Sequence, residues 1–265
     1  MSTVSRLGDS FAFLKAFARA RWGYRFSDRA HFERWQQRKL ANFLHNDIVA
    51  VPFFARLKEL NMESLPIMSK SEMRHSFAEL NRYGIDLDTA QEVGLSAERE
   101  RDFKPMLPGS ITVGLSSGTS GQRGVFLVSN RERSVWAGTV MARALSKAAL
   151  RHLINPFAEP LRVAFFLRAN SNLYTTLKGV RLNFQFGDLL QPFTELIDGL
   201  NALQPHLLIA PASVLRQFAR AQQNGKLAIQ PIQIISVAEV LESDDEQEIL
   251  KSWGVRTDQI YGNTE

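Results

Sequence analysis

Short apolar runs alternate with segments of helical periodicity from residue 110 to the end of the chain. The runs with the pattern of strands are 111–115, 125–128, 162–167, 182–186, 207–210, 232–237 and 255–261. The segments with the pattern of helices are 130–153, 193–203, 212–223 and 243–253. Because apolar strands that alternate with helices form parallel sheets covered on both faces, we predict an α/β fold with parallel sheets flanked by helices. Ligands of such sheets bind in the loops beyond the carboxyl ends of the strands.

Residues 1–109 lack this alternation and are predicted to form a helical amino-terminal segment packed on the core. Ser27 and Asp28 have the residue types of an N-cap between two helices. The helical patterns lie at 10–46, 69–81 and 88–102. We therefore expect the α/β core to occupy residues 110–265.

Composition excludes several classes of protein. The chain of 265 residues has no cysteine, which excludes disulfides, thiolate metal sites and thiol catalysis. Its net charge is 32 minus 27, or +5, and residues 1–60 hold 11 basic and 5 acidic residues, so this end carries the excess. A solvated basic helix face explains the excess, and we expect no nucleic-acid partner. No apolar run reaches about 18 residues, so we expect no membrane span and a cytoplasmic protein.

The segment LSSGTSGQRG, residues 115–124, lies between two expected strands and is rich in groups that bind phosphate. Its hydroxyl, glycine and basic residues are Ser116, Ser117, Thr119, Ser120, Gly118, Gly121, Gly124 and Arg123. Glycines let the backbone approach a ligand, and hydroxyls with successive backbone N–H groups can surround phosphate oxygens. Arg123 adds the positive charge that suits a polyphosphate. The alternative is a Gly/Ser hairpin turn, but a two-residue turn needs fewer of these residues.

Two other motifs fit this segment less well. A P-loop requires G-x-x-x-x-G-K-[ST], whereas five residues separate Gly118 from Gly124 and no Lys-Ser/Thr pair follows. Gly114 to Gly118 matches G-x-S-x-G, but the nucleophile elbow of a serine hydrolase requires a helix directly after the turn. Here a second strand is expected, so phosphate binding by another kind of loop is favoured.

LSSGTSGQRG is similar to the Ser/Thr/Gly loop of the adenylate-forming enzymes. Tyr261-Gly-Asn-Thr-Glu265 resembles the second signature of that family, aromatic-Gly-x-Thr-Glu. Between them, Ser236-Val-Ala-Glu239 resembles the adenine-pocket segment of the branch that contains phenylacetate–CoA ligases and the synthetases that attach AMP to a deazaflavin coenzyme. The chain thus resembles the amino-terminal portion of such an enzyme.

This resemblance implies a role for each matching residue. The loop would hold the β- and γ-phosphates of ATP through Ser116, Ser117, Thr119, Ser120, Arg123 and the backbone of Gly118, Gly121 and Gly124. The adenine pocket would be lined by Ala238, Glu239, Tyr261 and Gly262. Thr264 would contact the α-phosphate, and Glu265 would coordinate Mg²⁺, which prefers hard oxygen ligands. Thr264 and Glu265 are therefore the expected catalytic residues.

The activity implied is ATP-dependent adenylation of a carboxylate, such as an aryl acid, with release of pyrophosphate and with CoA as a candidate acyl acceptor. The alternatives are AMP transfer to a hydroxyl substrate and a non-catalytic nucleotide-binding or interaction module. Family members continue through a ribose-binding Asp and a small domain with a catalytic Lys. We therefore expect the 265-residue chain to be an amino-terminal portion or a truncation that is inactive by itself.

Overall fold

The computed structural model describes residues 3–57, 59–116, 123–168 and 181–260. The chain packs as two compact units: unit 1 comprises Met1–Arg21 and Arg131–Glu265, and unit 2 comprises Trp22–Asn130. Each unit has its own buried apolar core. The boundaries of these units differ from those of the expected segments 1–109 and 110–265, and that division into domains stays a prediction.

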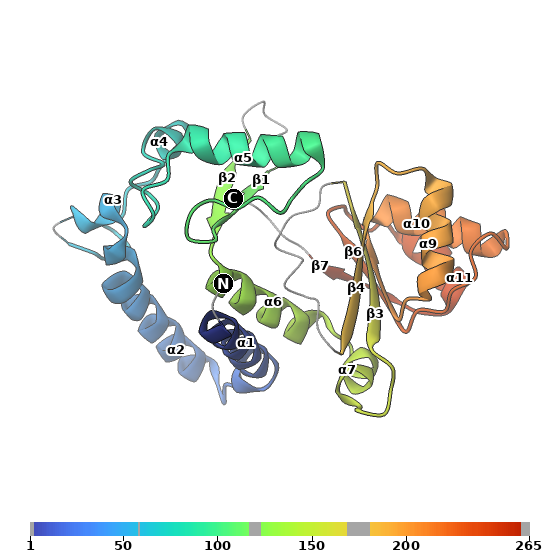
Figure 1. Cartoon of the computed structure of the whole chain (residues 1–265). Coiled ribbons are helices and arrows are strands. Elements are labelled where there is room, and N and C mark those ends of the chain that lie inside the picture. The colour runs from blue at the N-terminus through green and yellow to red at the C-terminus, as the bar shows by residue number, and fades with distance from the viewer. Residues whose placement is uncertain (1–2, 58, 117–122, 169–180, 261–265) are drawn as a thin grey trace. The chain divides into compact units, whose positions relative to one another are not determined.

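Unit 1 is built on a five-stranded parallel sheet with the strand order β4-β3-β5-β6-β7 (Figure 1). The strands are β3 (Leu161–Leu167), β4 (Leu182–Asp188), β5 (Leu207–Ala210), β6 (Gln233–Val237) and β7 (Thr257–Ile260). The predicted α/β class with a parallel sheet flanked by helices is thereby confirmed. Numbered within the sheet, the order is 2-1-3-4-5, so the direction in which strands are added reverses beside β3. Doubly wound sheets bind ligands beyond the carboxyl ends of the strands at such a point.

Helices cover both faces of this sheet. On one face lie α9 (Phe193–Leu203), α10 (Ala212–Gln223) and α11 (Ser243–Trp253), and on the other lies α6 (Asn130–Ala144) (Figure 1). Successive strand residues point to opposite faces. Ile234 accordingly packs in the cluster under α9, α10 and α11, and Ile235 packs in the cluster on the side of α6. This double burial explains why the strands read as continuous apolar runs.

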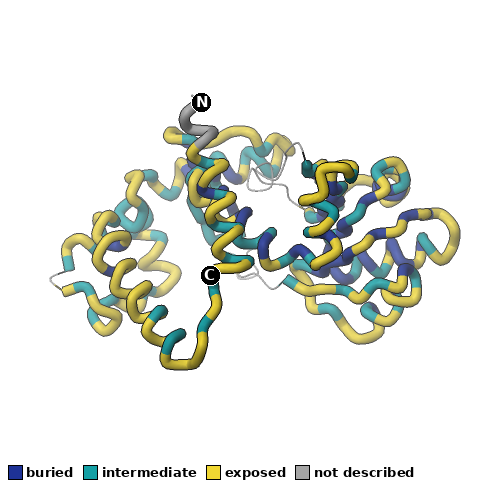
Figure 2. The backbone as a smooth tube through the Cα atoms, turned by 90° about the horizontal axis from the view of Figure 1, so that it is seen from below, coloured by how far each residue is buried: buried dark blue, intermediate teal, exposed yellow. Residues whose placement is uncertain are grey.

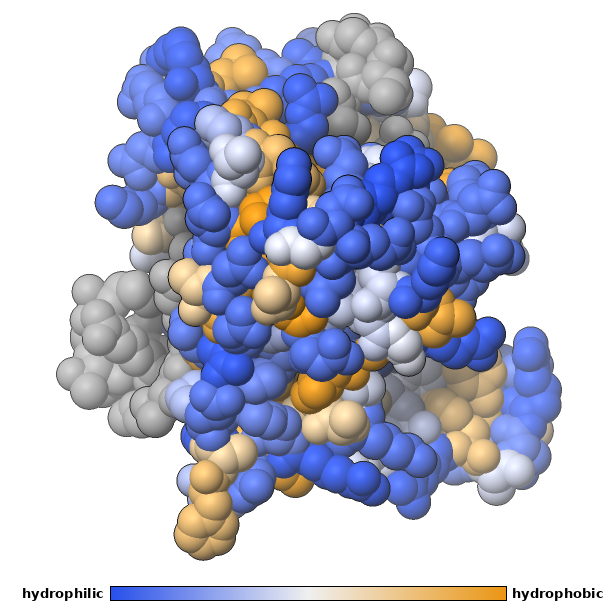
Figure 3. Space-filling model, turned by 90° about the vertical axis from the view of Figure 1, so that its right-hand side faces the viewer, coloured by the Kyte–Doolittle hydropathy of each residue, from blue (hydrophilic) through white to orange (hydrophobic). Residues whose placement is uncertain are grey.

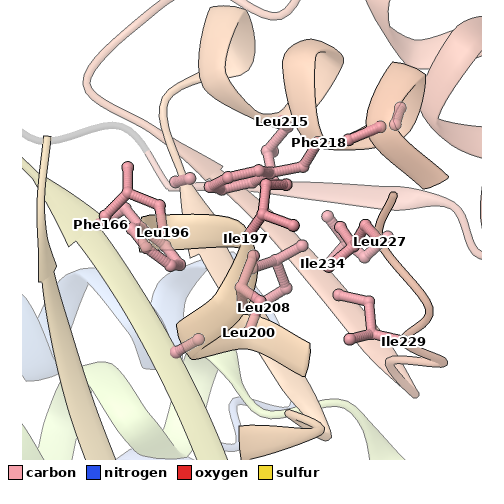
Figure 4. Packing of buried hydrophobic residues seen from close by; sticks show 14 of the residues in the cluster. Phe166, Leu196, Ile197, Leu200, Leu208, Leu215, Phe218, Leu227, Ile229 and Ile234 are labelled. Carbon is pink, nitrogen blue, oxygen red and sulfur yellow. The ribbon is translucent and has the colours of Figure 1, made fainter. Parts of the chain in front are cut away.

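The cluster under α9, α10 and α11 joins strands and helices through large side chains (Figure 4). The ring of Phe218 contacts that of Phe166 edge to face and stacks on that of Phe193. Leu208 and Ile234 are fully buried beneath the helices. Each such side chain contributes about 1.5–3 kcal/mol by leaving water, so this core fixes the strands whose ends carry the candidate site.

The expected helix 130–153 is divided into α6 and α7 (Lys147–Ile154), so the prediction of one helix is wrong. The side chain of Ser146 accepts a hydrogen bond from the backbone N–H of Ala149 and caps α7. The buried amide of Gln233 donates to the backbone oxygen of Ala144 at 2.7 Å and accepts from the backbone N–H of Ser146 at 2.9 Å. A side chain from β6 thus satisfies the backbone groups that a continuous helix would pair internally.

Helix α1 (Thr3–Ala18) packs against α6 within unit 1. A Cβ atom at Gly138 would lie 2.4 Å from the backbone oxygen of Phe13, so the two helices touch through a residue without a side chain. The guanidinium of Arg21 donates to the backbone oxygens of Ala142 and Leu145, each at 2.9 Å. Phe13 and Arg21 therefore join the amino-terminal helical segment to the α/β unit.

Unit 2 consists of short helices and one hairpin. Its elements are α2 (Arg29–Asn42), the helical turns η2 (Phe43–Asp47) and η3 (Ile48–Ala50), α3 (Pro52–Ala55), α4 (Lys70–His75), α5 (Leu87–Glu100), β1 (Thr112–Leu115) and β2 (Val125–Val128), and the turn η1 (Arg19–Gly23) follows α1. Asp28 caps α2 as expected, since its side chain accepts from the backbone N–H of His31. A capping box between Ser69 and Glu72 starts α4, which is shorter than the expected helix.

The first two strands do not join the parallel sheet that the alternation predicted. β1 and β2 pair antiparallel in a sheet of their own, with Leu115 opposite Val125. Nine residues separate the end of β1 from the start of β2, and a parallel pair would need a longer crossover connection. The connection between these two strands is the phosphate-loop candidate.

Burial follows this arrangement of elements. Most buried residues lie in the sheet of unit 1 and in the helices that cover it, whereas α2 has no buried residue (Figure 2). The outer face over α9, α10 and α11 is mostly hydrophilic, with apolar surface in discontinuous patches (Figure 3). Within the part of the chain that the structure describes, no helix has both the length and the apolarity needed to cross a membrane.

Candidate functional site

The hairpin of β1 and β2 presents the predicted phosphate loop, and Ser116 and Gly124 close its base. The backbone N–H of Ser116 donates to the backbone oxygen of Gly124 at 2.9 Å, and the backbone N–H of Gly124 donates to the Ser116 hydroxyl at 2.6 Å. A hydroxyl that accepts one bond keeps its own proton to donate. Ser116 therefore has a structural bond, and its hydroxyl proton, which has no acceptor among the described residues, can be donated to an anion.

Two glycines allow close packing, one within this hairpin and one between the hairpin and α5. A Cβ atom at Gly114 would lie 2.0 Å from the ring of Phe126, so that ring crosses β1 where a side chain would stand. On α5, a Cβ atom at Gly94 would lie 2.8 Å from the side chain of Leu115. Packing thus accounts for the first glycine of the G-x-S-x-G match, and the antiparallel β2 in place of a helix argues against a nucleophile elbow.

Arg123 is held by Glu98 of α5. Its two terminal nitrogens donate to the two carboxylate oxygens of Glu98 at 2.6 and 2.7 Å, and its Nε donates to the backbone oxygen of Ser116 at 2.7 Å. The pKa of the Glu98 carboxyl lies below its usual value, chiefly because Arg123 donates hydrogen bonds to it, and the same bonds raise the pKa of Arg123. Both groups are therefore charged at neutral pH, and the pair ties the end of the loop to α5.

The structure brings together three of the residues predicted to bind phosphate, namely Ser116, Arg123 and Gly124. Ser117, Gly118, Thr119, Ser120 and Gly121 lie outside the described residues, as do Tyr261, Gly262, Thr264 and Glu265. Their roles stay predictions. Ala238 and Glu239 are described, and they belong to unit 1, whereas the hairpin belongs to unit 2.

Ala238 and Glu239 follow the carboxyl end of β6 in unit 1. Val237, the last residue of β6, lies opposite Ile260, the last residue of β7, so these two parallel strands end side by side. Ala238 has a φ of 64°, which places a non-glycine residue in the left-handed region. Such residues cost about 1–3 kcal/mol of strain and cluster at ligand sites. The position supports the expectation that this segment contacts a ligand.

The carboxylate of Glu239 bonds the first turn of α10. It accepts from the backbone N–H of Ser213 at 2.8 Å and from the Ser213 hydroxyl at 3.0 Å. The N-cap residue of α10 is Pro211, which makes no side-chain cap bond, so Glu239 supplies a cap from another segment. Ser236 lies on β6, the strand that precedes Glu239. Its buried hydroxyl oxygen has no hydrogen-bond partner among the described residues.

A metal centre is not visible in the described part of the chain. No group of three or more His, Asp or Glu side chains there could hold a metal ion. Glu265, the predicted Mg²⁺ ligand, lies outside the described residues. The assignment of Mg²⁺ to Glu265 therefore stays a prediction.

Sequence reasoning missed Glu98 and Ser213. Glu98 lies 25 residues before Arg123 and on a different element, so no spacing connects the two in the sequence. Ser213 follows a Pro-Ala pair that gives no capping signal of its own. Both residues act through tertiary contacts with partners that the sequence had already singled out.

Comparison with known proteins gives distant structural similarity only. No protein-family model and no curated protein matches the chain. An open conformation of 2-hydroxyisobutyryl-CoA ligase in complex with 2-HIB-AMP and CoA matches at 11% identity and a TM-score of 0.43, over 96% of this chain and 49% of that chain. VinN matches at 15% and 0.39, over 76% and 54%. The adenylation domain of a carboxylate reductase from Mycobacterium chelonae matches at 17% and 0.32, over 91% and 35%.

The chain spans about half the length of the first of these structures. Likeness at this level of identity and TM-score does not transfer an activity to this chain.

Proposed function

We propose that the chain binds MgATP and belongs to a protein that activates a carboxylic acid as its AMP mixed anhydride. In this reaction a carboxylate oxygen forms a bond to the α-phosphorus of ATP. The bond from that phosphorus to the oxygen bridging to the β-phosphorus breaks, and pyrophosphate leaves. Catalysis of this kind depends on positioning and on stabilisation of charge at the phosphates.

The observation that carries the proposal is the position of Ala238 and Glu239 at the carboxyl end of β6, beside the end of β7. In the sequence, β7 runs directly into the YGNTE segment, residues 261–265. Two of the three segments that resemble adenylate-forming enzymes therefore follow neighbouring strand ends. Parallel α/β sheets bind their ligands at that edge.

The base of the β1–β2 hairpin gives separate support. Ser116 keeps a hydroxyl proton, Gly124 leaves space beside it, and Arg123 carries a positive charge. These are the groups that contact phosphate oxygens. We assign the loop to the β- and γ-phosphates of ATP.

The finer assignments belong to the same proposal. Glu265 would coordinate Mg²⁺ and Thr264 would contact the α-phosphate, while Tyr261 and Gly262 would face the adenine ring. The substrate would be an aryl or other small acid, and CoA would take the acyl group in a second step. Transfer of AMP to a hydroxyl is the runner-up reaction.

Titration calorimetry of the 265-residue chain with MgATP and with AMP tests the nucleotide site. We expect both to bind, with MgATP bound more tightly because it adds the phosphates that the loop contacts. If neither MgATP nor AMP binds, the proposed function is wrong. Isotope exchange between ATP and pyrophosphate, with a panel of aryl and alkyl acids, then tests the reaction. Binding without exchange in any form of the protein would favour a non-catalytic module.

A further inference from the structure

We propose that Glu98 is a positioning residue that orients the guanidinium of Arg123 toward an anionic ligand, the phosphate groups of MgATP. This inference rests on the proposed function, and it assigns a role to a residue that no sequence motif marks. It concerns the direction of the Arg123 donors, which the structure fixes through three hydrogen bonds.

The contact between Glu98 and Arg123 has the geometry of a bidentate fork. Each terminal nitrogen of Arg123 meets one oxygen of Glu98, at 2.6 and 2.7 Å. The two side chains are 27% and 30% exposed, so water screens the pair less than it would a pair on an open surface. A planar guanidinium held at two nitrogens by one carboxylate has little freedom to rotate.

Arg123 uses three of its N–H groups in these hydrogen bonds. A guanidinium has about five N–H groups in a fixed plane. Glu98 takes two and the backbone oxygen of Ser116 takes one, which leaves one N–H on each terminal nitrogen without an acceptor among the residues that the structure describes. Because the plane is fixed, the directions of these two donors are fixed as well. They are suited to oxygens that approach from the sides of the fork, as phosphate oxygens can.

Helix α5, which carries Glu98, is itself well packed. Helix α5 contacts β1 through the buried residue Gly94, which lies against Leu115. Ala90, on the same helix, is fully buried in the core of unit 2. Ser116, the next residue after β1, accepts the Nε bond of Arg123. Helix α5, strand β1 and the guanidinium of Arg123 are therefore held together by packing and hydrogen bonds, unlike an ion pair between two mobile surface side chains.

A neutralising role for Glu98 makes the opposite prediction. If the carboxylate only cancelled the charge of Arg123, removing it would strengthen the attraction of phosphates. If it positions Arg123, removing it lets the guanidinium turn and weakens binding, although the local charge becomes more positive. The sign of the change separates the two roles.

The test compares Glu98→Gln with the wild-type chain and with Glu100→Gln, a control on the same helix in an exposed pair with Arg99. Calorimetry gives the Kd of MgATP, inorganic triphosphate and adenosine for each. For Glu98→Gln we expect MgATP and triphosphate to bind about tenfold more weakly, the scale of one charge-assisted hydrogen bond. Adenosine affinity stays within about twofold because adenosine has no phosphate. Glu100→Gln leaves all three affinities unchanged.

Unchanged or tighter MgATP binding by folded Glu98→Gln overturns the inference. Should that variant fail to fold, Glu98→Asp keeps the charge but shortens the reach, and it must weaken triphosphate binding in the same selective way. Equal weakening of adenosine and MgATP would mark a general structural defect and also contradict the positioning role. If the wild-type chain binds no MgATP, the proposed function itself fails, a result distinct from these.

Discussion

The carboxylate of Glu239 and the backbone N–H of Ser213 lie 2.8 Å apart, so a residue after β6 caps the helix that follows β5. This bond joins two segments at the carboxyl edge of the sheet. It also gives Glu239 a structural role beside the predicted contact with adenine.

Replacing Glu239 with Ala should lower the free energy of unfolding by about 1 kcal/mol, the usual effect of losing an N-cap acceptor. Urea denaturation followed by circular dichroism measures this. Glu242→Ala is the matched control, because Glu242 stands at the N-cap position of α11 without a side-chain cap bond. If Glu239→Ala is as stable as the wild type and binds AMP as tightly, both roles given to Glu239 are wrong.

Gln233→Leu should destabilise unit 1 by about 2 kcal/mol or more. The substitution keeps the volume nearly constant but leaves the backbone groups of Ala144 and Ser146 without their partner, and each unpaired buried group costs about 1–3 kcal/mol. Denaturant titration measures the loss, and Gln217→Leu, at an exposed position of α10, provides the comparison. Equal effects of the two substitutions would show that the amide does not hold the junction of α6 and α7.

Gly138→Ala should destabilise the chain by about 1–3 kcal/mol, since the new methyl group would overlap the backbone of α1 and force the two helices apart. Gly8→Ala on α1 meets no atom within 4 Å and should instead stabilise the helix by up to about 1 kcal/mol. Thermal unfolding of both variants checks the opposite signs. A stable Gly138→Ala chain would contradict the close packing of α1 on α6.

Stability should fall as the pH falls below 6.5, partly because of His206. Burial lowers the pKa of His206, and the charges of Arg162 and His152 lower it further, against the opposing effect of Glu159. The unfolded chain therefore takes up a proton at His206 near pH 6.5 that the folded chain refuses until a lower pH. The stability that the neutral ring provides is complete above 6.5 and is lost between that value and the folded pKa.

His206→Asn keeps an acceptor near Nδ1 for the backbone N–H of Arg162 but cannot titrate. Denaturant titrations at about pH 7.5 and about pH 5.5 should show a smaller loss of stability for this variant than for the wild type. His75→Asn, at the exposed end of α4, provides the comparison. If His206→Asn loses as much stability between these two pH values as the wild type, His206 does not cause the pH dependence.

Local pattern predicted the regular part of the fold well. The bounds of α9, α10 and α11 follow from their periodicity and from the Pro or acidic residues at their starts. The strands are recognisable because both faces of the sheet are covered, which makes them apolar throughout. What the sequence does not contain is the partner of each strand, and so the antiparallel pairing of β1 with β2 stood only as the alternative of a hairpin turn.

In the candidate site, too, the sequence predicted local features but not the tertiary partners. Arg123 and Glu239 could be chosen from motifs, because charge and position in a loop are local properties. Their partners, Glu98 and Ser213, could not be chosen, because each meets its partner only in the folded chain. The same holds for Gln233, a polar residue in an apolar strand whose purpose becomes clear only from the three groups it bonds.

The position of β3 between β4 and β5 has a consequence for how unit 1 assembles. β3 is the first strand of the sheet in the chain, and both of its neighbours follow it. A chain that emerges from its amino end can pair β4 on one side of β3, then β5 on the other, and then add β6 and β7 outward in order. Every pairing joins strands separated by a crossover, and such non-local contacts form slowly. During synthesis the apolar edge of β3 therefore stays open until β5 arrives, which makes this strand the point where a delayed or damaged chain is most prone to aggregate.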